Sequence, residues 1–225
     1  MIKKFLLILF VAFLAQKKVG NETTNPINSN DDIYTVMHLE TSGLTPEAWR
    51  LAIRGFERLL ATGKLNNDSI LTIIDFSQSS KNKRLYVIDM NRQLLLHNTY
   101  VAHGLNSGEE FAEKFSNKSG SWMSSLGFYI TRGTKESATV GLSLSLEGLE
   151  KGFNDQAEQR QIIIHGAWYS TETFIRQHGR LGRSHGCPAV PLNMIKPLSE
   201  IIKDGSCIFI YSPDRDYLSK SKLLN

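Results

Sequence analysis

The sequence predicts a mainly β fold, a β-sandwich or barrel that carries a few short helices and an N-terminal helical extension. Short runs rich in apolar and β-branched residues follow one another from residue 70 onward, with turn residues between them. They cover residues 70–76, 84–90, 94–101, 126–131, 142–146, 161–167 and 207–212. Closely spaced strands of this kind are typical of sandwiches and barrels, whereas an alternating α/β sheet would place helices between them.

A long helix is predicted to begin just after Thr45. The Thr45 hydroxyl can cap it, Pro46 suits its first turn, and Glu47 lies near the positive end of the helix dipole. Apolar side chains then recur at helical spacing until Gly63. These side chains are Trp49, Ile53, Phe56, Leu59 and Leu60. We expect the helix to pack against the β domain; the alternative is a small docking module for another protein.

Two features are predicted inside the β region. The sequence Asp-Met-Asn-Arg at 89–92 is typical of a hairpin turn between two strands. A late helix is indicated by apolar side chains at helical spacing, followed by Gly205. Those side chains are Met194, Leu198, Ile201 and Ile202.

The N-terminus predicts an exported protein. Lys3 and Lys4 precede an apolar stretch, 5–15, that is too short to span a bilayer comfortably, so residues 1–20 are interpreted as a signal peptide. An uncleaved anchor and a buried N-terminal helix are the alternatives. Residues 21–67 are then a linker, polar and without periodicity through Asp32, and the helical extension. Residues 68–213 form the β domain, and residues 214–225 form a C-terminal tail.

Composition is that of an ordinary globular protein, with 41% hydrophobic and 21% charged residues. The formal net charge of +4 is too small to indicate a nucleic-acid partner. We also expect no stable membrane span once the signal peptide is removed.

The stretch around Cys187 carries the strongest chemical signal. Gly186 precedes this cysteine and Pro188 follows it, which indicates an irregular, exposed turn. A thiol attacks as thiolate, and its reference pKa of about 8.5 leaves only a few per cent ionised at neutral pH, so it needs a base. His165 ends an apolar run upstream and is a candidate for that base. Cys207 lies within an apolar run and is interpreted as core, with a Cys187–Cys207 disulfide as the alternative.

These residues also carry a family resemblance. Ser184-His185-Gly186-Cys187, with His165-Gly166 upstream, resembles the signature of the L,D-transpeptidases of bacterial cell-wall synthesis, and more closely that of the murein L,D-transpeptidase catalytic domain branch. The similarity extends through 101–108, 115–117, 124–127 and 148–150, and covers roughly residues 68–213. The wider family has an arginine two residues after the cysteine, where this chain has Ala189. Arg183 is a candidate to replace it in orienting the substrate.

The resemblance implies a β-sandwich whose catalytic cysteine lies in a groove between the sheets. It implies Cys187 as nucleophile and His165 as base. His185 shares a short segment with Cys187 and is a third catalytic candidate, which either orients the site, acts on a bound amine or only hydrogen-bonds its loop. The substrate-binding residues would be Arg183, Ser184, Gly186, Gly166, His103, Ser116, Asn117 and Ser125. Pro188 has no N–H, so the backbone N–H groups of Gly186 and Cys187 are the candidate donors to an oxyanion.

The resemblance further implies a reaction without a metal or organic cofactor. Peptidoglycan stem peptides would be both donor and acceptor, joined by 3→3 cross-links in the periplasm or cell envelope. Three alternatives remain: an L,D-carboxypeptidase that uses water as acceptor, an inactive wall-binding module, and a zinc site. The zinc site would use the histidine and cysteine side chains of His103, His165, His185 and Cys187.

Overall fold

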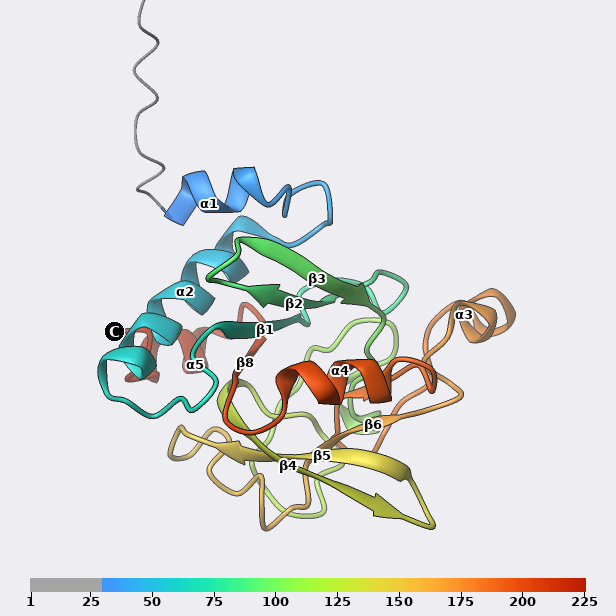
Figure 1. Cartoon of the computed structure of the whole chain (residues 1–225). Coiled ribbons are helices and arrows are strands. Elements are labelled where there is room, and N and C mark those ends of the chain that lie inside the picture. The colour runs from blue at the N-terminus through green and yellow to red at the C-terminus, as the bar shows by residue number, and fades with distance from the viewer. Residues whose placement is uncertain (1–29) are drawn as a thin grey trace, which may run out of the picture.

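The computed structural model describes residues 30–225, so the predicted signal peptide and most of the linker lie outside the described residues. The elements follow the order α1 (Asn30–Val36), α2 (Pro46–Ala61), β1 (Ile70–Asp75), β2 (Leu85–Asp89), β3 (Leu94–Thr99), η1 (Leu105–Ser107), β4 (Gly127–Ser137), β5 (Gly141–Gly148), β6 (Ile163–Gly166), α3 (Glu172–His178), β7 (Ala189–Val190), α4 (Ile195–Ile202), β8 (Cys207–Tyr211) and α5 (Arg215–Lys220). The predicted mainly β fold class is confirmed (Figure 1). No helix in the range 30–225 has the length and apolar character needed to cross a bilayer.

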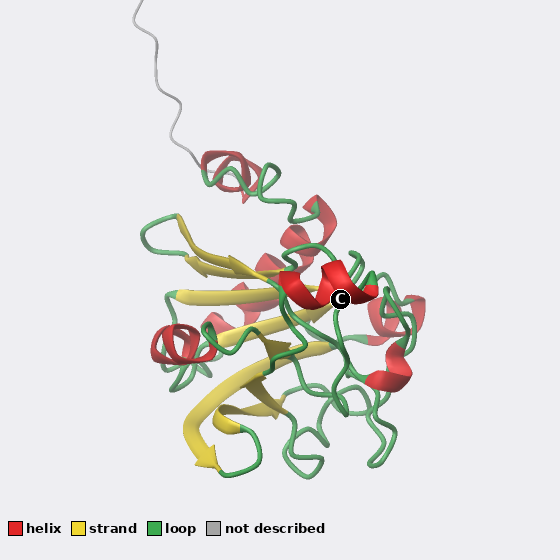
Figure 2. Cartoon of the chain, turned by 90° about the vertical axis from the view of Figure 1, so that its right-hand side faces the viewer, coloured by secondary structure: helices red, strands yellow, loops and turns green. Residues whose placement is uncertain are grey.

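All strands belong to one sheet, in the order β3-β2-β1-β8-β4-β5-β6-β7. Strands β1 and β8 pair in parallel, as do β6 and β7, and the remaining neighbours are antiparallel. The separate sheets expected of a β-sandwich are therefore joined edge to edge by hydrogen bonds into this one sheet. The junction is β4, whose register shifts between Thr131 and Thr134 and which is the long curved strand in Figure 2. A bulge of this kind bends a strand and increases its twist.

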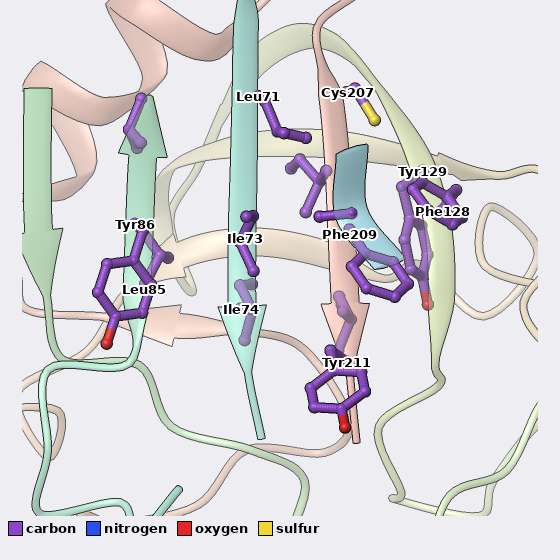
Figure 3. Close-up of a cluster of buried hydrophobic side chains, with 14 of the residues drawn as sticks. Leu71, Ile73, Ile74, Leu85, Tyr86, Phe128, Tyr129, Cys207, Phe209 and Tyr211 are labelled. Atoms are coloured by element: carbon purple, nitrogen blue, oxygen red, sulfur yellow. The ribbon is translucent and has the colours of Figure 1, made fainter. Parts of the chain in front are cut away.

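The hydrophobic core is built on the central strands. Burial is complete along β1, β2 and β8, because helices cover the sheet there and no strand face is left for polar residues. Phe128 stacks on Phe209 across the β4–β8 pair, with ring centroids 4.3 Å apart. Cys207 lies in the same cluster (Figure 3) and is fully buried. Its predicted place in the core is confirmed.

Helix α2 packs against β1 and β8 as expected. The Thr45 hydroxyl accepts from the Ala48 N–H at 3.3 Å, and Pro46 occupies the first turn. Gly55 allows the helix to lie directly on Phe128, because a Cβ at that position would come within 2.0 Å of the phenyl ring. On the other side of the core, α4 packs on β1, β5 and β6. The helix ends before Gly205, whose φ of +102° lies in the region that favours glycine.

Three short helices were not predicted. Helix α1 begins at Asn30, inside the segment interpreted as linker, and α3 lies between the predicted strand at 161–167 and the Cys187 turn. Helix α5 lies in the predicted tail and is docked by buried polar contacts. The Glu150 carboxylate accepts from the Tyr217 hydroxyl at 2.8 Å and from the Ser221 hydroxyl.

Candidate active site

A groove of about 1120 Å³ contains the residues that the sequence singled out most strongly. Its walls are the β4–β5 hairpin, the start of β6 and the turn at 183–187. The predicted site residues among its lining are His165, Arg183, Ser184, His185 and Cys187. Exposed residues 132–135 of β4 and Ser137 complete one wall.

Strand pairing places His165 beside the cysteine segment. In the parallel β6–β7 pair, His165 is opposite Ala189, and the His165 N–H lies 3.4 Å from the Pro188 carbonyl oxygen. The antiparallel β5–β6 pair fixes the other side of β6, with Ser143 opposite His165. Strands β5 and β7 therefore hold His165 next to Pro188, the residue that follows Cys187.

The hydrogen bonding of His165 determines its tautomer. Nδ1 lies 3.1 Å from the Gly166 carbonyl oxygen, which can only accept, so Nδ1 carries the proton. In the neutral ring, Nε2 is then a free acceptor. Burial lowers the pKa of His165, and the hydrogen bond to Gly166 opposes this in part. The ring is thus a neutral imidazole at neutral pH, and its Nε2 can take a proton.

The Cys187 turn is built by Ser184 and Gly186. The Ser184 Oγ accepts from the Gly186 N–H at 3.0 Å and donates to the Cys187 carbonyl at 2.6 Å. Gly186 has φ +121°, and a Cβ there would approach the Met123 carbonyl oxygen to 2.7 Å. The motif serine and glycine therefore shape the turn. The Ser184 hydroxyl is engaged on both sides within the turn, and the binding of substrate by Ser184 stays a prediction.

The same contacts revise the predicted oxyanion donors. Because the Gly186 N–H donates to Ser184, Gly186 is not available to bind an oxyanion or substrate through this group. Among the described residues, the Cys187 N–H has no hydrogen-bond partner. One of the two candidate donors therefore remains.

Both cysteines are free thiols, so the disulfide alternative is wrong. The Cys187 Sγ is half-buried in the groove and lies 3.7 Å from the Gln161 carbonyl oxygen. Burial raises the pKa of Cys187, while the Ile163 N–H and the charge of Arg160 oppose that rise. Cys207 is fully buried, and burial raises its pKa. Cys187 is therefore the thiol that a substrate in the groove can reach.

His185 is exposed at the groove wall and stacks on Trp122, with ring centroids 4.7 Å apart and an angle of 14° between the planes. Trp122 itself is 45% exposed, so its outer face remains open. Sequence reasoning missed this tryptophan, because it lies in a polar loop with no strand or helix pattern around it.

The prediction that His103 binds substrate is wrong, because the side chain is fully buried. Its Nδ1 lies 2.8 Å from the Arg84 Nη2, which can only donate, and its Nε2 lies 3.2 Å from the Gly108 carbonyl oxygen. Burial lowers the pKa of His103 to about 3, with the Arg84 charge acting in the same direction. With both ring nitrogens occupied, His103 also fails as a ligand in the zinc alternative. No group of three potential metal ligands is found between residues 30 and 225.

Four further predicted substrate-binding residues, Ser116, Asn117, Ser125 and Gly166, are not among the residues that line the groove. The Ser125 hydroxyl donates to the Ser116 carbonyl at 3.1 Å. The Asn117 amide donates to Asp155 at 2.7 Å and accepts from the Gln156 N–H at 3.1 Å. Gly166 is buried against the segment that leads into α4, where a Cβ would approach Leu192 to 3.2 Å. These residues support the loop and strand rather than line the groove.

Arg183 lines the groove, but its guanidinium is turned toward the loop that follows η1. Its Nη1 donates to Glu109 at 2.7 Å and to the Gly108 carbonyl at 3.1 Å. The arginine whose charge acts on Cys187 is Arg160, in the turn before β6. Sequence reasoning did not identify Arg160, because that turn carries no motif.

The sequence model of the L,D-transpeptidase catalytic domain matches residues 40–211 of the chain. No curated protein matches the chain in sequence. Among solved structures, the chain is similar to an L,D-transpeptidase from Mycobacterium smegmatis at 11% identity and a TM-score of 0.41, covering 64% of this chain and 59% of the other.

Two further solved structures give comparable values. A mutant of the Enterococcus faecium L,D-transpeptidase has 12% identity and a TM-score of 0.40, and the match covers 64% of this chain and 50% of the other. The L,D-transpeptidase of Xylanimonas cellulosilytica, residues 123–326, has 14% identity and a TM-score of 0.37, with 69% and 68% covered. The chain thus spans half to two thirds of the length of these relatives. By the family match over most of its length, the chain belongs to the L,D-transpeptidase catalytic domain family.

Proposed function

We propose that the protein is a cysteine L,D-transpeptidase that forms 3→3 cross-links between peptidoglycan stem peptides through a thioacyl-enzyme on Cys187. The observation that carries this proposal is that one accessible thiol, Cys187, and one imidazole, His165, line the same groove, and that the His165 Nε2 has no hydrogen-bond partner among the described residues. Membership of the family supplies the acyl-transfer class.

In the first half-reaction, His165 Nε2 accepts the Cys187 proton as the sulfur attacks the carbonyl carbon of the third stem residue. This carbon is in the amide bond to the terminal D-alanine. The tetrahedral oxyanion accepts a hydrogen bond from the Cys187 N–H. The C–N bond then breaks, and D-alanine leaves as an amine with the proton returned by His165. The stem peptide remains bound as a thioester.

In the second half-reaction, the side-chain amine of a neighbouring stem attacks the thioester. His165 accepts a proton from this amine, and the Cys187 thiolate leaves and is reprotonated. The neutral states of both groups fit this sequence, because burial raises the pKa of Cys187 and lowers that of His165. The thiolate is therefore generated at the moment of attack rather than stored.

Product analysis tests this proposal. The mature protein is incubated with disaccharide tetrapeptide, with and without an acceptor stem, and the products are identified by mass spectrometry. A transpeptidase releases D-alanine and yields a cross-linked dimer. Release of D-alanine with only tripeptide as product would assign the L,D-carboxypeptidase activity instead. Recovery of intact tetrapeptide under reducing, metal-free conditions would contradict both and favour a wall-binding module.

We also propose that the protein is exported to the periplasm or cell envelope, where its substrate would lie. The motivation is the sequence of residues 1–20, with Lys3 and Lys4 before an apolar stretch. Fractionation of cells that express the full chain, followed by N-terminal sequencing, checks this. A cytoplasmic product that retains Met1 and Lys3 would contradict it.

A further inference from the structure

The Arg160 guanidinium forms its hydrogen bonds with a single loop, residues 104–125. Its Nη1 donates to the Ser116 carbonyl at 2.6 Å and to the Ser125 hydroxyl. Its Nη2 donates to the Met123 carbonyl at 2.6 Å and to the Ser121 hydroxyl at 3.3 Å. One guanidinium therefore fixes four points of the loop, which the planar five-donor fork of arginine allows and a lysine ammonium does not.

The charge of Arg160 is not neutralised by a carboxylate. None of the ion pairs formed within residues 30–225 includes it. By contrast, the two other arginines that line the groove, Arg132 and Arg183, pair with Glu147 and Glu109. Arg160 is half-buried, so its field is screened less by solvent than that of a surface arginine.

The same guanidinium borders the Cys187 turn. A Cβ on Gly186 would come within 3.2 Å of the Arg160 Nη2 and within 2.7 Å of the Met123 carbonyl that this arginine holds. The other titratable side chains that line the groove are Arg132, Lys135, Glu147, Glu158, His165, Tyr169, Arg183 and His185. Of all these charged groups, Arg160 is the one whose charge lowers the pKa of Cys187.

We infer that Arg160 is the positioning residue of this site, holding the 104–125 loop against the Cys187 turn and supplying the fixed positive charge that favours the thiolate. This inference rests on the proposed role of Cys187 as nucleophile. The two contributions have different origins. The loop depends on the four hydrogen bonds, and the thiolate depends on the charge.

Two substitutions separate these contributions. Arg160→Gln removes the charge and most of the hydrogen bonds, whereas Arg160→Lys keeps the charge and loses the bridging geometry. Arg132→Gln is the matched control, because Arg132 lines the same groove and pairs with Glu147. The alkylation rate of Cys187 by iodoacetamide is measured against pH by peptide mass spectrometry, and turnover of disaccharide tetrapeptide is measured in parallel.

We expect Arg160→Gln to raise the alkylation midpoint of Cys187 by roughly half to one pH unit, the direction that follows from losing a nearby positive charge. Arg160→Lys should keep the midpoint near that of the wild type. Both should reduce turnover by about tenfold or more, because a small misplacement of the site is costly. Arg132→Gln should leave the midpoint unchanged.

A wild-type midpoint in folded Arg160→Gln would overturn the electrostatic contribution, and wild-type turnover in Arg160→Lys would overturn the positioning. If circular dichroism shows that the Arg160 variants do not fold, the double variant Ser121→Ala/Ser125→Ala replaces them. It removes two acceptors of Arg160, and undiminished turnover would contradict the inference. The alkylation midpoint of Cys187 does not depend on turnover. If the protein has no transpeptidase activity, the proposed function is wrong, but the midpoint still tests the role of Arg160.

Discussion

At the scale of single residues, the site depends on one hydrogen bond that fixes a tautomer. The Gly166 carbonyl holds the proton of His165 on Nδ1 and leaves Nε2 free, which suits a general base. Sequence reasoning identified His165 and Cys187 from their local patterns. It could not identify which N–H groups of the turn are free, because the Gly186 N–H is occupied by a side chain, Ser184, whose rotamer is fixed only in the folded turn.

Removal of the base gives the first prediction. We expect His165→Ala to reduce turnover by a factor on the order of a hundred or more, the usual scale for a positioned general base. His178→Ala is the control, since His178 is exposed on α3 and is not part of the groove lining. A steady-state assay on disaccharide tetrapeptide makes the comparison. If His185→Ala lost as much turnover while His165→Ala kept it, the base would be His185.

The two cysteines give the second prediction. Cys187 should react with iodoacetamide at neutral pH much faster than Cys207, because only Cys187 is accessible. Cys187→Ala should abolish turnover with the fold intact, and Cys207→Ser should leave reactivity of Cys187 unchanged while destabilising the core by placing a hydroxyl in it. Peptide mass spectrometry and far-UV circular dichroism measure these outcomes. Equal labelling of both thiols in the folded protein would be inconsistent with this core.

At the scale of elements, the C-terminal helix α5 is held by a buried carboxyl group. Glu150 accepts from the Phe128 N–H at 2.8 Å, and so joins α5 to the start of β4. Gly127 and Gly148 are needed beside it, because a Cβ on Gly127 would lie 2.4 Å from the carboxylate and one on Gly148 would lie 1.9 Å from the Asn154 carbonyl oxygen. The stretches 124–127 and 148–150, which carry part of the family resemblance, thus contain residues with a structural role.

Loss of one donor to this carboxyl group gives the third prediction. Tyr217→Phe should lower the free energy of unfolding by about 1 to 2 kcal/mol, because a buried acceptor loses a hydrogen-bond partner. Tyr100→Phe is the matched control, because the Tyr100 hydroxyl has no hydrogen-bond partner within the described chain. The free energy of unfolding of Tyr100→Phe should stay within about 0.5 kcal/mol of the wild-type value. Urea unfolding measures both, and equal stabilities would mean that α5 is not anchored through Glu150.

The strands were predictable from sequence because most are short apolar runs bounded by turns, and their starts and ends agree closely with the structure. The second half of β4 was missed, because 132–137 is a polar, exposed continuation without apolar alternation. The two-residue strand β7 was missed because it is too short to show a pattern. Its parallel pairing with β6 is a long-range contact, and that pairing is what sets His165 beside the cysteine segment.

At the scale of the whole molecule, buried neutral histidines give the fourth prediction. Burial holds the pKa of His103 at about 3 and lowers that of His165. In the unfolded chain both would protonate near 6.5, so below that pH the unfolded state binds protons that the folded state does not. The free energy of unfolding should therefore fall as pH decreases from about 6.5 to 5.

The slope should approach about 1.4 kcal/mol per pH unit for each such proton. Glu150 opposes this in part, because burial raises its pKa and the folded state keeps that proton longer. Urea titrations at several pH values measure the slope. A stability that is flat from pH 6.5 to 5 would mean that the buried histidines protonate in the folded state.

The account depends most on a covalent bond between Cys187 and the donor stem. Its direct test is mass spectrometry of the intact protein and its peptides after brief exposure to disaccharide tetrapeptide, quenched in acid, which preserves thioesters. We predict an adduct on Cys187 equal in mass to the donor minus D-alanine. We also predict its accumulation when the acceptor stem is left out, and its absence in Cys187→Ala. Cross-linked product formed without any adduct on Cys187, or an adduct that persists in Cys187→Ala, would contradict the assignment of this cysteine as the nucleophile.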